Sequence, residues 1–379
     1  MTSTLILGGG FGGLAAAHEL RARLPEHEVT VVAAEDHFYN GFAKTWDLVG
    51  ARPLEQGTAS LSALHRHGIR FVHTRITAID PAHCRVETEA GPLSADFLVI
   101  ALGANTPPEQ TAQLRGSAHD LYSADALPAM RTDLARLDSG TLVVPVLGTP
   151  YKCPPAPYEA AFLLDDYLRG RGVRDQVQLL VTTPQPMTMP GAGSEVSTFV
   201  ADALTDRGIQ LRTEQSVQTI DPDARTVLFA DGDRLPYTLL LAVPQAVAPQ
   251  VVADSPLAGE GGWIHPDRET RRTDFDRVYA VGDCTASPPP KAGIFAEGMA
   301  RVAARNIAAE VDGGQGDRFD GTGYCFLEFP EQRAATLEGN FFAEPKPDVR
   351  MAEPDTDTFT RKHAFEAERL RNWLDATPT

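Results

Sequence analysis

The stretch that decides the fold is "TLILGGGFGGLAAAHELRARL", residues 4–24. An apolar run of strand type leads into Gly8, Gly10 and Gly13 at Gly-x-Gly-x-x-Gly spacing, and a helix pattern rich in small residues follows. The first glycine permits a tight turn, the second lets the backbone approach a pyrophosphate, and the third allows close packing of helix on strand. A second strand pattern, "EVTVVAAED" (28–36), comes next. We therefore predict a dinucleotide-binding unit rather than an ordinary glycine-rich turn.

The remaining residues of this unit complete the predicted cofactor loop. Phe11 and Gly12 lie between the glycines and open the helix, whose free N–H groups would face an anion. An acid at the end of the second strand usually binds the ribose hydroxyls. Here two alanines come first and the acids arrive late, as Glu35 and Asp36. We assign Glu35 to the site, and leave open that either acid reaches the ribose or that both face solvent.

Length and composition bound the class of protein. The chain has 379 residues, of which 42% are hydrophobic, enough for two or three globular domains. Without an apolar run of 18 residues or a signal-peptide pattern before the first strand, we expect a cytoplasmic protein, with peripheral membrane contact left open. The formal charge of −17 and the absence of a basic stripe argue against nucleic acid as a partner.

The cysteines indicate thiol chemistry rather than a metal site. Cys84, Cys153, Cys284 and Cys325 are widely spaced and form no Cys-x-x-Cys pair. This pattern argues against structural zinc and against a disulfide-stapled secreted module. Buried thiols or redox chemistry remain, and we predict no metal.

Two further segments resemble the flavoproteins that have two dinucleotide-binding domains, the pyridine nucleotide-disulfide oxidoreductase type. "ADFLVIALGANTPP" (95–108) ends a strand with Ala101 and Gly103, and residues 275–311 contain a strand that ends in Gly282 and Asp283 before a helix. The resemblance implies bound FAD, with the Asp283 carboxylate accepting a hydrogen bond from the ribityl chain. It also implies that the following helix points its N-terminus at the flavin ring, where its dipole stabilises negative charge. The alternative for Asp283 is an ordinary helix N-cap.

The order of segments predicts an α/β protein with two Rossmann-like domains, each a doubly wound parallel sheet. We predict a discontinuous FAD-binding domain of residues 1–108 and 246–320, with an inserted Rossmann-like domain at 109–245. A C-terminal region, 321–379, would close over the flavin.

The inserted domain lacks an intact nicotinamide-dinucleotide fingerprint. After the strand pattern, "GTPYKCPPAPYEAA" (148–161) has no further glycines, and Pro154, Pro155 and Pro157 remove backbone N–H donors. The sequence therefore argues against an NADH or NADPH site.

Three segments resemble a narrower group, the sulfide:quinone oxidoreductases and the flavoprotein subunit of flavocytochrome c sulfide dehydrogenase. They are "CPPAPYEAAFLLDDYL" (153–168), "PPPKAGIFAEGMARVAARNI" (288–307) and "GTGYCFLEF" (321–329), in which the family cysteine precedes a strand. The resemblance implies oxidation of sulfide or a related small sulfur species through a Cys153/Cys325 redox pair to FAD and on to a quinone.

This chemistry assigns roles to several residues. Hydrosulfide attacks a disulfide sulfur and leaves a persulfide and a thiolate; the family places Cys325 nearer the flavin and the persulfide on Cys153. Lys152 and Lys291 would lower the pKa of a thiol or stabilise reduced flavin, or else be surface residues. Glu159 would relay protons or be an exposed first-turn acid. Cys84 and Cys284 have no family role and are assigned a structural one.

The sequence departs from the family in three places. Residues 104–152 lack the third redox cysteine of many quinone-reducing members, and "DHFYNGFAKTW" (36–46) lacks the cysteine that binds FAD covalently in the flavocytochrome relatives, so we predict non-covalent FAD. The tail "TDTFTRKHAFEAERLRNWLDA" (356–376) predicts one short amphipathic helix. Its apolar stripe would contact an anionic membrane, or pack on the protein or on a second subunit of a homo-oligomer. The stripe comprises Phe365, Leu370, Trp373 and Leu374.

Two alternative functions stay open at this point. One is an NADH-dependent quinone or disulfide reductase, which the missing second fingerprint disfavours. The other is an FAD-binding redox subunit that lacks sulfide turnover and passes electrons to a protein partner, which the short tail and the missing third cysteine favour.

Overall fold

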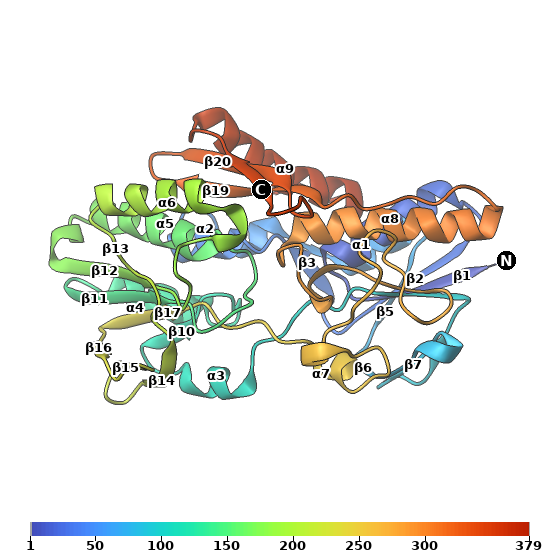
Figure 1. Ribbon diagram of the computed structural model, residues 1–379, viewed down its shortest axis with the longest axis horizontal. Coiled ribbons are helices and arrows are strands. Elements are labelled where there is room, and N and C mark those ends of the chain that lie inside the picture. Colours follow the sequence, from blue (N-terminus) through green and yellow to red (C-terminus); the bar gives the residue numbers. More distant parts are fainter. Residues whose placement is uncertain (1, 379) are drawn as a thin grey trace.

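The computed structural model describes residues 2–378, which build two five-stranded parallel sheets and a third, smaller layer (Figure 1). The first sheet has the strand order β18-β9-β1-β2-β5 and the second the order β10-β17-β11-β12-β13. The strands of the first sheet are β1 (Ser3–Leu7), β2 (Glu28–Ala33), β5 (Arg70–His73), β9 (Phe97–Ile100) and β18 (Val278–Ala280). The strands of the second sheet are β10 (Ala118–Asp120), β11 (Gly140–Pro145), β12 (Val177–Thr182), β13 (Gln210–Arg212) and β17 (Leu239–Ala242).

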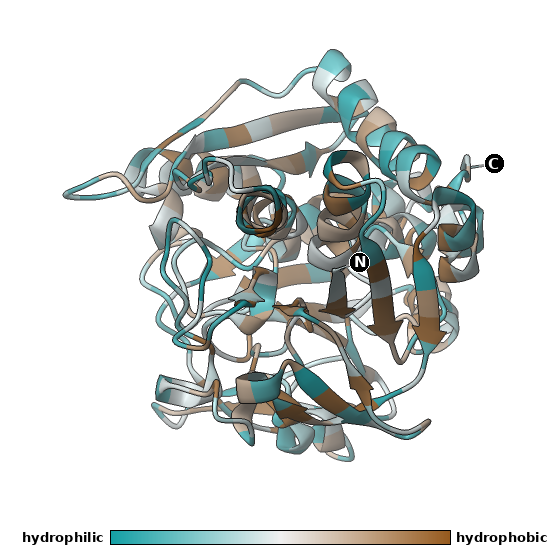
Figure 2. Cartoon of the chain, turned by 90° about the vertical axis from the view of Figure 1, so that its right-hand side faces the viewer, coloured by the Kyte–Doolittle hydropathy of each residue, from teal (hydrophilic) through white to brown (hydrophobic). Residues whose placement is uncertain are grey.

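Both sheets are apolar throughout their centres. β9 and β17 are buried at every position, as expected of parallel strands that are covered on both faces. Figure 2 shows brown, hydrophobic residues concentrated on the strands and teal, hydrophilic residues on the outer helices and loops. The predicted fold class, α/β with two Rossmann-like sheets, is confirmed.

Helices cover the sheets. The α-helices are α1 (Phe11–Arg23), α2 (Ala43–Leu48), α3 (Pro108–Gln113), α4 (Leu127–Ala135), α5 (Ala156–Gly170), α6 (Ser194–Asp206), α7 (Gln250–Ala253), α8 (Gly293–Asp312) and α9 (Thr356–Leu374). Short 3₁₀ helices are η1 (Leu54–Gly57), η2 (Leu61–His67), η3 (Pro81–His83), η4 (Arg174–Gln176), η5 (Pro190–Ala192), η6 (Glu260–Gly262) and η7 (Gly282–Cys284).

Small residues let α1 approach its neighbours closely. α1 packs along α8, and the buried faces of both helices are rich in alanine. At the start of α1, a Cβ on Gly13 would lie 1.8 Å from the carbonyl oxygen of Gly8. Gly8 itself has φ +114°, a conformation that glycine adopts readily. The turn after β1 therefore depends on both glycines.

Four antiparallel units complete the fold: β3 (His37–Tyr39) with β4 (Thr58–Ser60); β6 (Ile76–Asp80), β7 (Arg85–Thr88) and β8 (Leu93–Ser94); β14 (Val217–Asp221), β15 (Thr226–Phe229) and β16 (Arg234–Pro236); and β19 (Thr322–Phe329), β20 (Arg333–Asn340) and β21 (Asp348–Met351). Cys325 lies within β19, so the expectation that it precedes a strand is wrong. The pairing of β19 with β20 over eight residues extends the strand past the cysteine on both sides.

The C-terminal layer lies across both sheets and is red in Figure 1. β19 contacts α5 and α8, whereas α9 contacts β20, β4, α1 and the η1 and η2 turns. The layer therefore touches helices of both Rossmann-like units, at the side where their glycine and cysteine loops lie.

The apolar stripe of α9 is used inside the molecule. All four of its residues are buried, and Trp373 packs edge-on against Phe11 and Phe38 with ring centres 5.7 Å apart in each pair. Of the sequence alternatives, packing on the protein is correct, and membrane contact through this stripe is wrong. Across residues 2–378, no helix combines the length and apolar character needed to cross a bilayer.

Candidate active site

Three loops meet at the carboxyl ends of the first sheet. They follow β1, β9 and β18, the central strand β1 lying between β2 and β9. The loops touch: a Cβ on Gly12 would lie 3.1 Å from Val281 and 3.5 Å from Ala101. This is the point in a doubly wound sheet where the strand order reverses and ligands bind. The structure thus brings together the glycine loop, the Ala101–Gly103 turn and the Gly282–Asp283 turn.

The glycine loop fits the pyrophosphate of a dinucleotide. Within the described part of the chain, the amide N–H groups of Phe11, Gly12 and Gly13 have no hydrogen-bond acceptor, and Gly10 caps α1 without a side-chain bond. A Cβ on Gly10 would meet nothing within 4 Å, so the space in front of these amides is open. Free N–H groups at a helix start are an anion site.

Phe11 contributes to the site in two ways. Its amide belongs to the open loop, while its ring stacks on Phe365 of α9 at 6.2 Å between centres. The ring also lies under the start of α8, where a Cβ on Gly293 would lie 2.7 Å from it. Phe11 thereby joins the glycine loop to the C-terminal layer.

The two acids after β2 differ in availability. The Asp36 carboxylate contacts His37 Nδ1 at 3.0 Å, whereas Glu35 is exposed and has no partner among residues 2–378. Glu35 is thus the acid whose oxygens are free to accept bonds from a ribose.

Asp283 lies in the η7 turn, ten residues before Gly293, the first residue of α8. Ala292 is the N-cap residue of α8, so the alternative that Asp283 caps this helix is wrong. No described group donates a hydrogen bond to its carboxylate, which remains available as an acceptor. Burial raises the pKa of Asp283, opposed by the charges of Lys291 and Lys152.

Lys291 is an interior residue, with 4% of its surface exposed, so the surface alternative is wrong. Its Nζ donates to the carbonyl oxygens of Asp283 at 2.8 Å and Thr285 at 2.9 Å. It also lies 3.5 Å from the ring centre of Trp263. Burial lowers the pKa of Lys291 to about 8. The ammonium group therefore braces the η7 turn beneath Asp283.

Cys153 is held in an unusual backbone conformation by the same segment. It has φ +54°, and its N–H donates to the carbonyl oxygen of Lys291 at 2.7 Å. A non-glycine residue in the left-handed region is destabilised by roughly 1–2 kcal/mol, and such strain clusters at functional sites. The loop after β11 thus presents the thiol with the help of the first unit.

Cys153 and Cys325 are far apart in sequence, but β19, which holds Cys325, packs against α5, which begins three residues after Cys153. Burial raises the pKa of Cys325 well above that of a free thiol, and the charge of Cys153 is the next cause. Burial also raises the pKa of Cys153 to about 12, with the Glu159 charge as a second cause. Both cysteines are partly accessible free thiols in this structure. Uncharged sulfur, as thiol or disulfide, is the favoured form in this environment.

A buried ionic triad behind the cysteines was missed by the sequence analysis. Lys362 of α9 has 0% exposure, and its Nζ donates to Glu159 Oε1 and to Glu328 Oε2 at 2.7 Å each. Glu159 Oε2 accepts the Glu328 N–H at 2.8 Å, and Glu328 accepts Trp46 Nε1–H at 2.8 Å. In the sequence, Lys362 looks like any polar residue beside an apolar stripe.

The triad acts on Cys153. Burial and the charge of Glu159 raise the pKa of Cys153, and the charge of Lys362 lowers it. Glu159 is 5% exposed, so the expectation of an exposed first-turn acid is wrong. Burial raises the pKa of Glu159, and the Glu328 charge adds to this against the opposing Lys362 charge.

Two more lysines lie near Cys153. Lys152 precedes it and donates to the Ala104 carbonyl oxygen at 3.4 Å. Lys44 of α2, which the sequence analysis did not single out, donates to the Tyr122 carbonyl oxygen at 2.6 Å. Tyr122 in turn donates its hydroxyl to the Lys152 carbonyl oxygen at 2.5 Å.

The other two cysteines are packing residues. Cys84 is buried at the β6–β7 turn, and Cys284 has 0% exposure with its Sγ 3.3 Å from the Val281 carbonyl oxygen. Residues 2–378 contain no group of three or more His, Cys, Asp or Glu side chains arranged to hold a metal ion.

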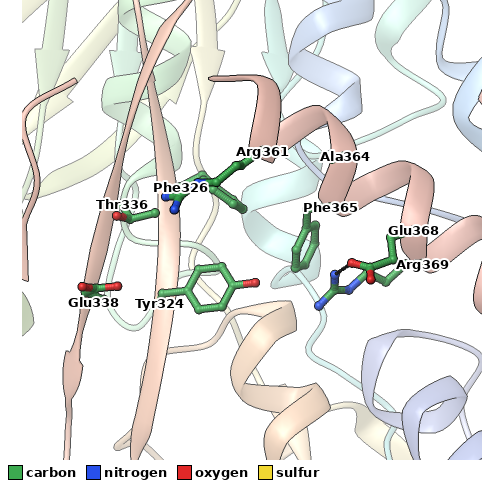
Figure 3. Close-up of a pocket in the computed structure, with 9 residues that line it drawn as sticks. All are labelled: Tyr324, Phe326, Thr336, Glu338, Arg361, Ala364, Phe365, Glu368 and Arg369. Carbon is green, nitrogen blue, oxygen red and sulfur yellow. Dashed lines mark hydrogen bonds and ion pairs between the residues drawn. The ribbon is translucent and has the colours of Figure 1, made fainter. Parts of the chain in front are cut away.

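An aromatic pocket of about 320 Å³ lies between β19–β20 and α9. Figure 3 shows Tyr324 and Phe326 on the strand side, facing Phe365 and Arg369 on the helix side. The Tyr324 and Phe365 rings meet edge to face at 6.3 Å, and Arg369 lies 3.7 Å over the Phe365 ring. Because side chains alternate along a strand, this pocket and Cys325 lie on opposite faces of β19.

A glycine loop with free amides, an unpaired aspartate before a helix start and a converging thiol pair define a flavin-dependent oxidoreductase with two Rossmann-like units. The family model for pyridine nucleotide-disulphide oxidoreductases matches residues 2–144 and 158–306, more than half of the chain. The chain belongs to this family, as the sequence predicted. The match passes over residues 145–157, the segment that holds Cys153 and the three prolines.

Curated relatives and a solved structure agree with this assignment. The chain is 25% identical over 358 residues to the mitochondrial sulfide:quinone oxidoreductase of Mus musculus, covering 90% of this chain and 78% of the mouse protein. It is 26% identical over 372 residues to the sulfide-quinone reductase of Aquifex aeolicus, covering 90% and 83%. The crystal structure of the Aquifex aeolicus sulfide:quinone oxidoreductase superposes with a TM-score of 0.89 at 24% identity, covering 99% of this chain and 92% of that one.

Proposed function

We propose that this protein is a sulfide:quinone oxidoreductase, which oxidises sulfide through Cys153 and Cys325 to non-covalently bound FAD and passes the electrons to a quinone. The observation that carries the proposal is the thiol pair: Cys325 lies in β19, and β19 packs against α5, the helix that begins three residues after Cys153. The backbone of Lys291 in the predicted flavin-binding unit positions Cys153. The names of the mouse and Aquifex relatives support the same substrate and acceptor.

FAD would be held by the residues that the first unit brings together. The amides of Phe11, Gly12 and Gly13 would bind the pyrophosphate, Glu35 the ribose, and Asp283 the ribityl chain. In this proposal, residues 1–108 and 246–320 form the FAD-binding domain, residues 109–245 the inserted domain, and residues 321–379 the region that closes over the flavin. Residues 36–46 contain no cysteine, which supports non-covalent binding.

The first chemical step takes place at sulfur. Hydrosulfide attacks Sγ of Cys153 in a Cys153–Cys325 disulfide; the S–S bond breaks, a persulfide forms on Cys153, and the electron pair leaves with Cys325 as a thiolate. The flavin, when bound, supplies a two-electron acceptor for this thiolate. The order of the cysteines follows the family.

The buried triad manages charge and protons during this step. Lys362 stabilises a thiolate at Cys153 by direct charge attraction, since it lowers the pKa of that thiol. Glu159 has a raised pKa from burial and lies in charge range of both cysteines. Its Oε atoms are therefore suited to hold a proton that thiol chemistry releases or takes up.

The quinone would occupy the aromatic pocket of Figure 3. Its rings offer stacking partners, and Arg361 and Arg369 offer donors for quinone oxygens. Because the pocket and Cys325 lie on opposite faces of β19, sulfur and quinone would not compete for one site.

An anaerobic titration tests the proposal. Sulfide should bleach the flavin absorbance of the holoenzyme rapidly, and a soluble quinone should restore it. Cys153→Ser and Cys325→Ser should bind FAD and lose bleaching by sulfide, whereas Cys84→Ser, the matched cysteine control, should keep it. Bleaching by NADH, or full sulfide activity in either active-site variant, would contradict the proposal. No bleaching by either donor would favour a redox subunit that receives electrons from a protein partner.

A further inference from the structure

Two lysines near Cys153 form no direct ion pair with any carboxylate of the described residues. Lys44 lies on α2 in the first unit, and Lys152 in the loop after β11 in the second. Over residues 2–378, Lys362 is the one lysine that pairs with carboxylates, although the formal charge of the chain is −17. Half-buried cations without a carboxylate in direct contact are uncommon in a protein so rich in acids, because desolvating an unpaired charge is unfavourable.

Both ammonium groups lie near the same aromatic ring. Lys44 Nζ is 5.9 Å and Lys152 Nζ is 5.8 Å from the ring centre of Tyr122. Each ammonium has three protons to donate, and within the described residues each has one carbonyl acceptor, at 2.6 Å for Lys44 and 3.4 Å for Lys152. Four of their six N–H donors therefore remain for a ligand.

Charge in this pair is only partly balanced. Asp120 lies in charge range of both lysines and Asp283 in charge range of Lys152, but one Asp120 oxygen accepts the Tyr122 N–H at 2.7 Å. Burial lowers the pKa of Lys44 to about 8 and the Lys152 charge lowers it too, whereas Asp120 and a Cys153 thiolate act in the opposite direction. Lys44 and Lys152 thus repel each other, and an anion between them and Cys153 would relieve that repulsion.

We propose that Lys44 and Lys152 form an anion site that holds hydrosulfide against Sγ of Cys153, and that this lysine pair selects the anionic form of the substrate. The identity of the anion rests on the proposed function, whereas the anion site itself does not. Bound there, the hydrosulfide sulfur bonds to Cys153 Sγ as the bond to Cys325 breaks. The hydrogen stays on the outer sulfur and the electron pair leaves with Cys325. The lysines act as positioning residues, since they attract the nucleophile and gain or lose no bond.

The site is tested by alkylating the reduced holoenzyme with iodoacetate, an anion, and with iodoacetamide, its neutral analogue. Mass spectrometry reads the modification rate at Cys153. Both reagents need the same thiolate and the same access, so the ratio of their rates reports the local charge alone. We expect Lys44→Gln and Lys152→Gln each to lower the ratio by about fivefold, and the double variant by more than about tenfold. Lys44→Arg and Lys152→Arg should retain the ratio.

Three comparisons make the result decisive. Lys346→Gln, at an exposed lysine in the β20–β21 connection, makes the same charge change and should leave the ratio unaltered. Thermal melting and flavin content separate lost charge from lost fold. A double-glutamine variant that folds, binds flavin and keeps the wild-type ratio would overturn the inference.

A second readout ties the site to sulfide. The kcat/KM for sulfide should fall about tenfold in the double variant, and flavin reduction by tris(hydroxypropyl)phosphine, a neutral reductant that attacks disulfides without losing a proton, should be unaffected. Equal loss with both reductants would overturn hydrosulfide selection. If wild-type flavin is not bleached by sulfide while the alkylation ratio still depends on the lysines, the proposed function fails and the anion site stands.

Discussion

Replacing Lys362 with methionine removes the cation that ties α9 to the active-site layer. Lys362 Nζ contacts Glu159 and Glu328 at 2.7 Å each and is 0% exposed. Methionine keeps most of the side-chain length and leaves two buried carboxylates without a counter-charge. Removing one partner of a buried ion pair typically destabilises a protein by about 3–5 kcal/mol. That is a large part of the roughly 5–15 kcal/mol that stabilises a folded domain.

The loss should depend on pH in a defined direction. Burial raises the pKa of Glu159, and the positive charge of Lys362 opposes this rise. Without Lys362, the pKa of Glu159 in the folded state should lie further above its value in the unfolded state. A group of this kind contributes stability below its unfolded pKa, and the contribution is lost as pH rises through the folded pKa. We therefore expect the variant to be closer to the wild type near pH 5 than near pH 8.

Urea denaturation of the holoenzyme, followed by tryptophan fluorescence at both pH values, measures the change. Lys346→Met, at the exposed lysine, is the matched control and should shift stability by less than about 0.5 kcal/mol. A Glu159→Gln and Glu328→Gln pair combined with Lys362→Met should recover much of the loss, because no buried charge remains. If Lys362→Met unfolds within about 1 kcal/mol of the wild type at pH 8, our account of the triad is wrong.

Further outcomes concern the cofactor loop, the thiol and the acceptor pocket. Gly13→Ala should lose both stability and flavin content, since its Cβ would lie 1.8 Å from a carbonyl oxygen, whereas Gly10→Ala, with open space around its Cβ, should fold normally and lose mainly flavin affinity. Cys153→Gly should be about 1 kcal/mol more stable than Cys153→Ala, and so melt at a higher temperature, because glycine adopts φ +54° without steric cost. Equal melting temperatures would show that the backbone at residue 153 is not strained. Because burial raises the pKa of Cys153 to about 12, its rate of alkylation by iodoacetamide should keep rising with pH through roughly pH 9 and 10, where an ordinary thiol levels off. Arg369→Ala should raise KM for quinone in flavin reoxidation while bleaching by sulfide stays at the wild-type rate; slowed bleaching would refute the pocket assignment.

Much of the fold was predictable because it depends on local patterns. Fully buried parallel strands appear as short apolar runs, and the glycine spacing after β1 reflects contacts within a single turn. The C-terminal layer was less accessible: Cys325 lies inside β19 rather than before a strand. Its pairing with β20 is a tertiary hydrogen-bond pattern that the segment "GTGYCFLEF" does not encode by itself.

The candidate site was likewise predictable only in part. The sequence singled out Cys153, Lys291 and Asp283, but it left surface or capping alternatives open for the last two. Burial and hydrogen bonding excluded these alternatives, since Lys291 donates to two carbonyl oxygens in the interior and Ala292 caps α8.

The amino-acid sequence alone determined the Rossmann-like architecture. It also predicted the cofactor loop and the loss of a second phosphate loop, because glycine spacing, apolar runs and prolines act on the backbone within a few residues. Only the tertiary structure decided that Lys362 is a buried counter-ion and that Lys44 is a half-buried cation near a thiol. A lysine has the same letter in the sequence whether its side chain faces water or two carboxylates. The difference arises when Lys362 of α9 meets Glu159, 203 residues away, and Lys44 of α2 meets Tyr122, 78 residues away. Burial of the two thiols in the folded protein is the largest cause of the raised pKa values of Cys153 and Cys325.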